Sequence, residues 1–392
     1  MAQQARFAAI LDGPLDNPES DRFDRAAYAR GIAELILEYD GADSFVVGLY
    51  GAWGEGKSTL LRFVQRGLDE AGNAVSVVGY NPWLGTTADE MVKEVLQTVD
   101  EALGGGDSKA TELLGVFEQL AKAGTQAAPD PASKLFAITA HALASTIRQA
   151  RSGDSAMLGR IDRAMERQGR RVVVMVDDVD RLDGDTAFEL LKLIMLMRSL
   201  PRVVFLVACD RTMVAKAIGH RFGGRHADGT AFLEKVVQVG LDIPPAAVHQ
   251  LESYIVESLA EFVGRDTNSD DGEYEDALRE ALKQCVLPIH RTPRSVSRLV
   301  DAVRFGFDKL AGEVDLIDFV LIEALRLGSP EVFDLVRSHT EVLCNGGRSR
   351  GEVLLASRAG KNVVERTGSM STRMLLADEM ELALGSMPRV EA

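Results

Sequence analysis

Residues 44–68 read SFVVGLYGAWGEGKSTLLRFVQRGL, and this stretch decides the fold of the chain. An apolar run rich in β-branched and aromatic residues comes first, and a helical pattern with apolar residues on one face follows the glycine-rich centre. The centre has the spacing Gly51-x-x-x-x-Gly56-Lys57-Ser58, which is the phosphate-binding P-loop pattern. We therefore predict a buried strand, a phosphate-binding loop and a helix whose N-terminus points at a nucleotide.

The residue types of this loop each have a chemical purpose. Glycines let the main chain fold around a triphosphate with its N–H groups pointing inward. The ammonium group of Lys57 is expected to bind the β- and γ-phosphates, and the hydroxyl of Ser58 is expected to ligate Mg²⁺. The predicted nucleotide-binding residues are those of the loop and the first helical turn: Gly51, Ala52, Trp53, Gly54, Glu55, Gly56, Lys57, Ser58 and Thr59.

A second chemical landmark is the segment RVVVMVDDVDRL at residues 171–182. Its continuous apolar run is typical of a strand buried on both faces of a parallel sheet, and it ends in Asp177 and Asp178. Ligands bind at the carboxyl ends of such strands, so this is the Walker B arrangement of a P-loop protein. We expect Asp177 to hold Mg²⁺ and Asp178 to orient or deprotonate the attacking water. A turn of solvated acids fits Asp180 and Asp183, but not acids that directly follow an apolar strand.

A third apolar strand, predicted over Val203–Ala208, ends in Cys209-Asp210-Arg211. A polar residue at this strand tip commonly senses the γ-phosphate in this class of NTPase, which makes Asp210 a candidate catalytic residue. The alternative is that Asp210 is the N-cap of a helix that begins near Thr212.

Two further strands complete the predicted sheet, one over residues 74–79 and one over residues 236–243, the latter after a glycine- and histidine-rich loop at 219–229. Five short apolar strands separated by helices predict an α/β fold with a doubly wound parallel sheet. We predict a lead-in at residues 1–21, an NTPase core at 22–243 with a helical insertion at 107–169, a helical domain at 244–343 and a tail at 344–392.

Composition and charge bound the function further. The chain has 392 residues, of which 46% are hydrophobic and 26% charged, so it is an ordinary globular protein. Its 59 acidic and 44 basic residues give a net charge of −15, which argues against bulk electrostatic binding of nucleic acid or anionic membrane. Three widely spaced cysteines indicate a reducing compartment. No basic N-terminal region precedes an apolar stretch and no 18 apolar residues run together, so we expect a cytoplasmic protein.

Several segments together resemble the KAP family of P-loop NTPases, a branch related to the STAND NTPases: GAWGEGKSTLL, YNPW, VVVMVDDVDRL, VVFLVACDRTMV and FLEKVVQVGLDIPP. The resemblance extends over roughly residues 15–335. It implies a five-stranded sheet of order 5-1-4-3-2, binding of ATP with Mg²⁺, a switch-like role and, in bacteria, defence against phages and plasmids. Many members carry transmembrane helices between the P-loop and Walker B segments. The insertion of this chain departs from that pattern, since it has no apolar run of membrane length.

The resemblance also bears on the segment TPRSVSRL at residues 292–299. Arg294 and Arg298 are four residues apart and share one helix face. Family membership implies that this helix belongs to a lid over the nucleotide, where an arginine contacts the γ-phosphate. The alternative is that both arginines lie on the surface and pair with nearby acids.

These observations lead to one main hypothesis and two alternatives. The main hypothesis is a slow Mg²⁺-dependent ATPase switch that acts with partner subunits of a defence complex or with further copies of the chain. The first alternative is a scaffold subunit that binds ATP without hydrolysing it. The second is a nucleic-acid-stimulated motor, which the acidic charge disfavours.

Overall fold

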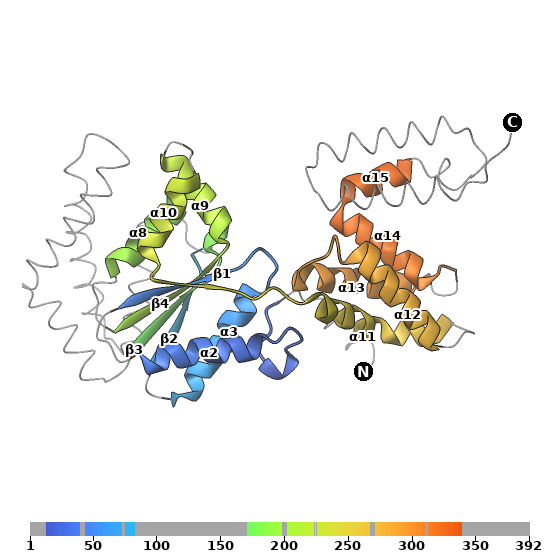
Figure 1. Cartoon of the computed structure of the whole chain (residues 1–392), viewed down its shortest axis with the longest axis horizontal. Helices are drawn as coiled ribbons and strands as arrows, with labels where there is room; N and C mark the ends of the chain where they lie inside the picture. Colours follow the sequence, from blue (N-terminus) through green and yellow to red (C-terminus); the bar gives the residue numbers. More distant parts are fainter. Residues whose placement is uncertain are drawn as a thin grey trace, which may run out of the picture. The chain divides into compact units, whose positions relative to one another are not determined.

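The computed structural model describes residues 13–39, 44–72, 75–82, 171–197, 202–222, 224, 226–266, 271–310 and 313–338. These residues fall into two compact units, which meet in the sequence between Pro244 and Pro245. The first unit is an α/β sheet with its helices and the second is entirely helical (Figure 1). The predicted helical insertion and the predicted tail lie outside the described residues.

A five-stranded parallel sheet forms the centre of the first unit, in the order β2-β3-β4-β1-β5. Read from the other edge, this is the predicted order 5-1-4-3-2, so the fold prediction is confirmed. The strands are β1 (Phe45–Tyr50), β2 (Val75–Tyr80), β3 (Arg171–Val176), β4 (Val203–Cys209) and β5 (Val239–Asp242). Because all strands run the same way, the carboxyl ends of β1, β3 and β4 lie at the same side of the sheet, where Asp177 and the loop after Tyr50 lie together.

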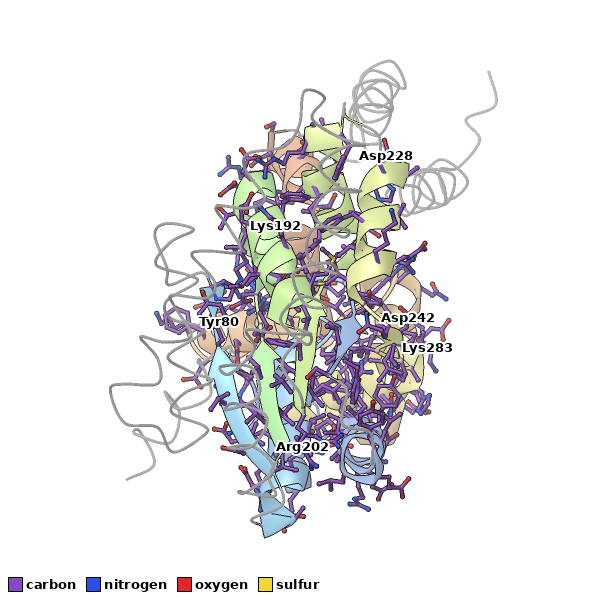
Figure 2. The ribbon with its side chains drawn as sticks, turned by 90° about the vertical axis from the view of Figure 1, so that its left-hand side faces the viewer. Tyr80, Lys192, Arg202, Asp228, Asp242 and Lys283 are labelled. Carbon is purple, nitrogen blue, oxygen red and sulfur yellow. The ribbon has the colours of Figure 1, made fainter. Side chains whose placement is uncertain are left out.

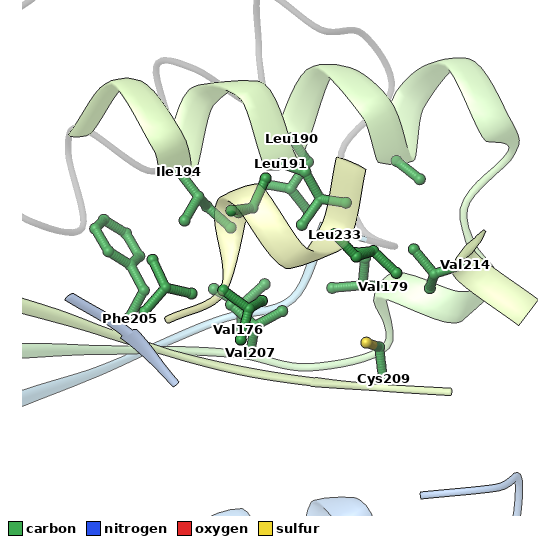
Figure 3. Packing of buried hydrophobic residues seen from close by; sticks show 14 of the residues in the cluster. Val176, Val179, Leu190, Leu191, Ile194, Phe205, Val207, Cys209, Val214 and Leu233 are labelled. Atoms are coloured by element: carbon green, nitrogen blue, oxygen red, sulfur yellow. The ribbon is translucent and has the colours of Figure 1, made fainter. Parts of the chain in front are cut away.

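Helices cover both faces of this sheet, since alternate strand residues point to opposite sides. One face packs on α8 (Gly184–Met197), α9 (Arg211–Gly219) and α10 (His226–Val236), as Figure 3 shows for Val176, Val207 and Leu233. The other face packs on α2 (Arg25–Glu38) and α3 (Lys57–Glu70). Short 3-10 turns complete the unit: η2 (Pro18–Ser20), η6 (Val179–Arg181) and η7 (His220–Phe222). The three central strands, β1, β3 and β4, are therefore buried on both sides, whereas the outer strands β2 and β5 are only partly buried.

The predicted site lies at the carboxyl ends of the strands. Tyr80 is the last residue of β2, whereas Arg202 immediately precedes β4, so the two mark the carboxyl and the amino ends of the parallel strands (Figure 2). The main-chain N–H of Asp177 donates to the carbonyl of Tyr80 at 3.2 Å, which extends the pairing of β2 and β3 past the last strand residues. The backbone at the start of the acidic segment is thus fixed by its neighbour.

Two local predictions were wrong around β5. The loop predicted at 219–229 contains η7 and the start of α10, and the strand predicted from Val236 begins only at Val239. Gly229 lies inside α10, where an added Cβ would be 2.0 Å from the carbonyl oxygen of Ala215. This glycine therefore allows α9 and α10 to pack closely, and its presence is a sign of helix contact and not of a loop.

The second unit consists of α11 (Val248–Asp266), α12 (Asp271–Ala281), the π-helical turn η8 (Leu282–Val286), α13 (Pro293–Phe307), α14 (Leu316–Gly328) and α15 (Pro330–Ser338). The start of α13 is a capping box in which Thr292 and Ser295 bind each other's main-chain N–H groups, with Pro293 in the first turn. Within the described ranges, no helix combines the length and the apolar character needed to cross a membrane.

Candidate functional site: the P-loop and the acidic segment after β3

The P-loop connects β1 to α3 and has the backbone that its glycines predict. Gly54 and Gly56 have φ angles of 89° and 91°, a region that favours glycine over all other residues. The loop is closed on itself by Glu55, whose carboxylate accepts the N–H of Ala52 at 2.8 Å. The N–H of Gly51 donates to the carbonyl of Cys209 at 3.3 Å, so the loop is tied to the end of β4.

The remaining loop residues differ in exposure. The side chain of Trp53 is 67% exposed and therefore does not pack against the sheet. The hydroxyl of Thr59 accepts the N–H of Leu15 at 3.2 Å, which attaches the segment before α2 to the start of α3. Trp53 is thus available to a ligand, while Thr59 already has a structural partner.

Lys57 is the most constrained residue of the site, because its side chain is only 8% exposed. Its ammonium nitrogen lies 3.0 Å from the carbonyl oxygen of Gly51 and 3.4 Å from that of Ala52. It also forms an ion pair with the carboxylate of Asp180 at 3.2 Å. The P-loop lysine and the acidic segment after β3 are therefore in direct contact.

A second contact joins the same two segments. The hydroxyl of Ser58 is hydrogen-bonded to the carboxylate of Asp177, and burial raises the pKa of that carboxyl while the Ser58 bond opposes the rise. These are the two residues that the sequence predicted as Mg²⁺ ligands. Mg²⁺ in nucleotide sites is typically held by one or two protein oxygens together with phosphates and water, so this pair fits the ion. Across the described ranges, no three His, Cys, Asp or Glu side chains converge on a possible metal site.

Asp178 is held in an unusual conformation at the end of β3. Its φ of 60° is rare for a residue other than glycine. One carboxylate oxygen accepts the side-chain amide of Asn81 at 3.0 Å, and the other pairs with the guanidinium of Arg181 at 2.9 Å. Strained residues with fixed side chains are typical of functional sites, and here the two partners fix the direction in which the carboxylate points.

The structure assigns a clear local role to Asp210. Its carboxylate accepts the N–H groups of Thr212 and Met213 at 2.9 and 3.0 Å, so it is the N-cap of α9, the alternative that the sequence left open. Its own main-chain N–H donates to Asp180 at 3.3 Å. Asp210 thus connects to the site through its backbone.

Asp180, Asn81 and Arg25 belong to the site and were missed by the sequence analysis. Asp180 is only 12% exposed and pairs with Lys57, so it is not a solvated turn acid. The guanidinium of Arg25 is buried and donates to the main-chain carbonyls of Glu55, at 3.4 Å, and Pro244. Burial lowers the pKa of Arg25, but the group remains a cation. Arg25 therefore fixes the P-loop to the last residue of the first unit.

The sequence also predicted two nucleotide contacts in the helical unit. Arg294 and Arg298 lie one turn apart on α13, as their spacing requires. Their contact with a nucleotide stays a prediction.

Cys209, at the end of β4, offers a test of how tightly this edge of the sheet is packed. Burial raises the pKa of its thiol to about 12, and the nearby carboxylate of Asp180 contributes in the same direction. Because only the thiolate reacts with alkylating reagents, Cys209 should stay unmodified at pH 8 until the protein is unfolded. Mass spectrometry after iodoacetamide treatment, with and without denaturant, measures this. Cys285, which is half-buried, serves as the internal comparison, and rapid native labelling of Cys209 would contradict the packing.

Comparisons with known proteins identify the family of the chain. The protein-family model described as "KAP family P-loop domain" matches residues 25–305 of the chain. The chain is similar to the "Phage T7 exclusion protein" of Escherichia coli (strain K12), with 23% identity over 354 residues that cover 83% of this chain and 47% of that protein. The chain thus spans about half the length of this curated relative.

Solved structures with similarity to the chain were also found. The Aeropyrum pernix ORC1 protein in complex with DNA matches with 15% identity and a TM-score of 0.41, over 96% of this chain and 87% of that one. The Thermotoga maritima RuvB Holliday junction branch migration motor matches with 12% identity and a TM-score of 0.36, over 93% of this chain and 89% of that one.

Proposed function

The chain belongs to the KAP family of P-loop NTPases, and from this we propose that it binds ATP with Mg²⁺ and hydrolyses it slowly as a switch. The observation that carries the proposal is the pair of contacts between the P-loop and the segment after β3, Ser58 with Asp177 and Lys57 with Asp180. A triphosphate in the loop would meet a cation, main-chain N–H groups and the predicted Mg²⁺ ligands within one small region.

The residues have distinct proposed roles. The main-chain N–H groups of the P-loop bind phosphate oxygens, and Lys57 neutralises the β- and γ-phosphates. Ser58 and Asp177 would hold Mg²⁺, which supplies charge neutralisation to the phosphates when bound. Asp178, held by Asn81 and Arg181, would accept the proton of the attacking water. Hydrolysis should be slow because an aspartate stands where many related ATPases have the longer glutamate.

The biological role that we propose is the ATPase component of a bacterial system that acts against phages or plasmids. The support is the similarity to a protein named for phage T7 exclusion. The proposed partners are other subunits of such a complex or further copies of this chain, and Arg294 and Arg298 are proposed to contact the nucleotide from the helical unit. The proposed place of action is the cytoplasm, where the thiols of Cys209 and Cys285, which form no disulfide, would stay reduced.

A steady-state assay of ATP hydrolysis tests the enzymatic proposal. Asp178→Ala should lower kcat by about a hundredfold, because general-base catalysis contributes roughly that much, while the affinity for ATP stays within about threefold of wild type. Asn81→Ala should lower kcat less, since the Arg181 contact still positions the carboxylate. If wild type binds ATP yet hydrolyses it no faster than Asp178→Ala, the non-hydrolysing scaffold is the correct function. Strong stimulation of wild type by DNA or RNA would instead favour the motor.

A further inference from the structure

The carboxylate of Asp180 connects three parts of the site. It belongs to η6, directly after the Asp177-Asp178 pair, and is 12% exposed. Its Oδ2 atom lies 3.2 Å from the ammonium of Lys57 and also accepts the main-chain N–H of Asp210 at 3.3 Å. One carboxylate oxygen therefore joins the P-loop lysine to the junction of β4 and α9.

The ammonium of Lys57 has no donor to spare. An ammonium group has three N–H donors, and three acceptors surround this one: the carbonyls of Gly51 and Ala52 and the carboxylate of Asp180. A phosphate oxygen that binds Lys57 must replace one of them. Asp180 is the only one of the three that carries a full charge, and it repels an incoming phosphate directly.

We propose that Asp180 is a positioning residue that competes with the nucleotide phosphates for Lys57 and thereby sets the affinity for nucleotide. This inference rests on the proposed function, because it assumes that a triphosphate binds at Lys57. The Asp210 N–H holds the carboxylate in place beside the loop, so the competition persists after Lys57 turns to the phosphate. Asp180 should therefore weaken the binding of a metal-free triphosphate, which carries more negative charge, more than it weakens the binding of the Mg²⁺ complex.

The test is equilibrium binding of ATP by calorimetry, once with EDTA and once with excess Mg²⁺, to wild type and to Asp180→Asn. Asparagine keeps the shape and the acceptor for the Asp210 N–H but removes the charge. We expect Asp180→Asn to bind metal-free ATP about tenfold more tightly than wild type, a change of about 1.4 kcal/mol. With Mg²⁺ present, the increase in ATP affinity from wild type to Asp180→Asn should be smaller, because the bound nucleotide is less negative.

Two control variants define the cause. Asp185→Asn removes the same charge from an exposed acid that pairs with Arg221 at 3.0 Å, and it should leave ATP affinity unchanged. Asp180→Glu keeps the charge and should bind metal-free ATP as weakly as wild type does. Thermal melting verifies that each variant folds, and Asp180→Ser repeats the test if the asparagine variant does not fold.

The outcomes separate this inference from the function on which it rests. Unchanged or weaker binding of metal-free ATP by a folded Asp180→Asn, while wild type binds ATP, would overturn the role of Asp180 and leave nucleotide binding intact. An equal increase in affinity for metal-free ATP in Asp185→Asn would mean that the net charge of the protein causes the effect, and would also overturn the role of Asp180. No binding of ATP to wild type or any variant would overturn the proposed function, and the inference with it.

Discussion

Replacement of Lys57 by alanine should lower ATP hydrolysis by at least about a hundredfold, because a preorganised cation at the phosphates contributes about that much to transition-state stabilisation. The same change should also lower the free energy of unfolding by about 3 kcal/mol, since it leaves the buried carboxylate of Asp180 without its partner. Loss of activity in this variant alone would therefore not distinguish a missing phosphate contact from a damaged fold. Urea unfolding and a hydrolysis assay must be measured together.

The double variant Lys57→Ala/Asp180→Ala separates the two effects. Removal of both members of a buried ion pair avoids the unpaired charge, so most of the lost stability should return. Hydrolysis should not return, because the phosphates still lack their cation. Lys192→Ala is a matched control, since Lys192 forms an ion pair on α8 away from the P-loop, and it should change neither quantity appreciably. Full activity in either Lys57 variant would contradict the role of this lysine.

Replacement of Asp177 by asparagine should have opposite effects on activity and stability. Hydrolysis with Mg²⁺ should fall by at least about a hundredfold, because the proposed metal ligand loses its charge. The melting temperature at pH 7.5 should rise by a few degrees, because burial, with the charge of Asp178 added to it, raises the pKa of Asp177 and disfavours its ionised form in the fold. Asparagine retains an acceptor for the N–H of Asp178, which Asp177 binds at 2.8 Å.

The sign of this effect fixes its pH dependence. Below the ordinary pKa of the carboxyl, Asp177 is protonated in both the folded and the unfolded wild type, so Asp177→Asn is no more stable than wild type. As the pH rises toward the raised pKa, the folded wild type retains a proton that the unfolded chain has lost, so wild type becomes progressively less stable than the variant. The stability gain of Asp177→Asn should therefore shrink as the pH is lowered. Thermal melts over a series of pH values measure it, and a gain that does not depend on pH would contradict this cause.

Asp183 provides the matched control with the opposite sign. Bonds from the hydroxyl and the N–H of Thr186, together with the N–H of Asp185, lower the pKa of its carboxyl. The ionised form is thus favoured in the fold and caps the start of α8. Asp183→Asn should lower the melting temperature at neutral pH without affecting hydrolysis.

The positions of the P-loop and of the central strands follow from the sequence because they depend on local patterns, whereas the order of the strands was implied by the resemblance to the KAP family. A P-loop requires glycine at positive φ, and a strand buried on both faces requires a continuous apolar run such as the one before Asp177. Helix α10 did not follow, since its glycine and histidine content is typical of loops and only the packing of Gly229 against α9 explains it. Tertiary contact here overrides propensity.

The role of Asp180 could not be predicted for a related reason. Spacing places it after the strand, but only the short η6 turn brings its carboxylate back to Lys57, more than a hundred residues earlier in the chain. Arg25 is a similar case, because an arginine in the first turn of a helix normally faces water, and its burial depends on carbonyls of Glu55 and Pro244. Such long-range polar contacts leave no periodic signal in a sequence.

The most direct test of the central claim is the coupling between Mg²⁺ and Asp177 in nucleotide binding. ATP affinity should be measured by calorimetry with excess Mg²⁺ and with EDTA, for wild type and for Asp177→Asn. If the nucleotide lies between the P-loop and the acidic segment after β3, Mg²⁺ will tighten ATP binding to wild type and have little effect in the variant. An equal effect of Mg²⁺ on both proteins, or no uptake of ATP by wild type, would contradict the account.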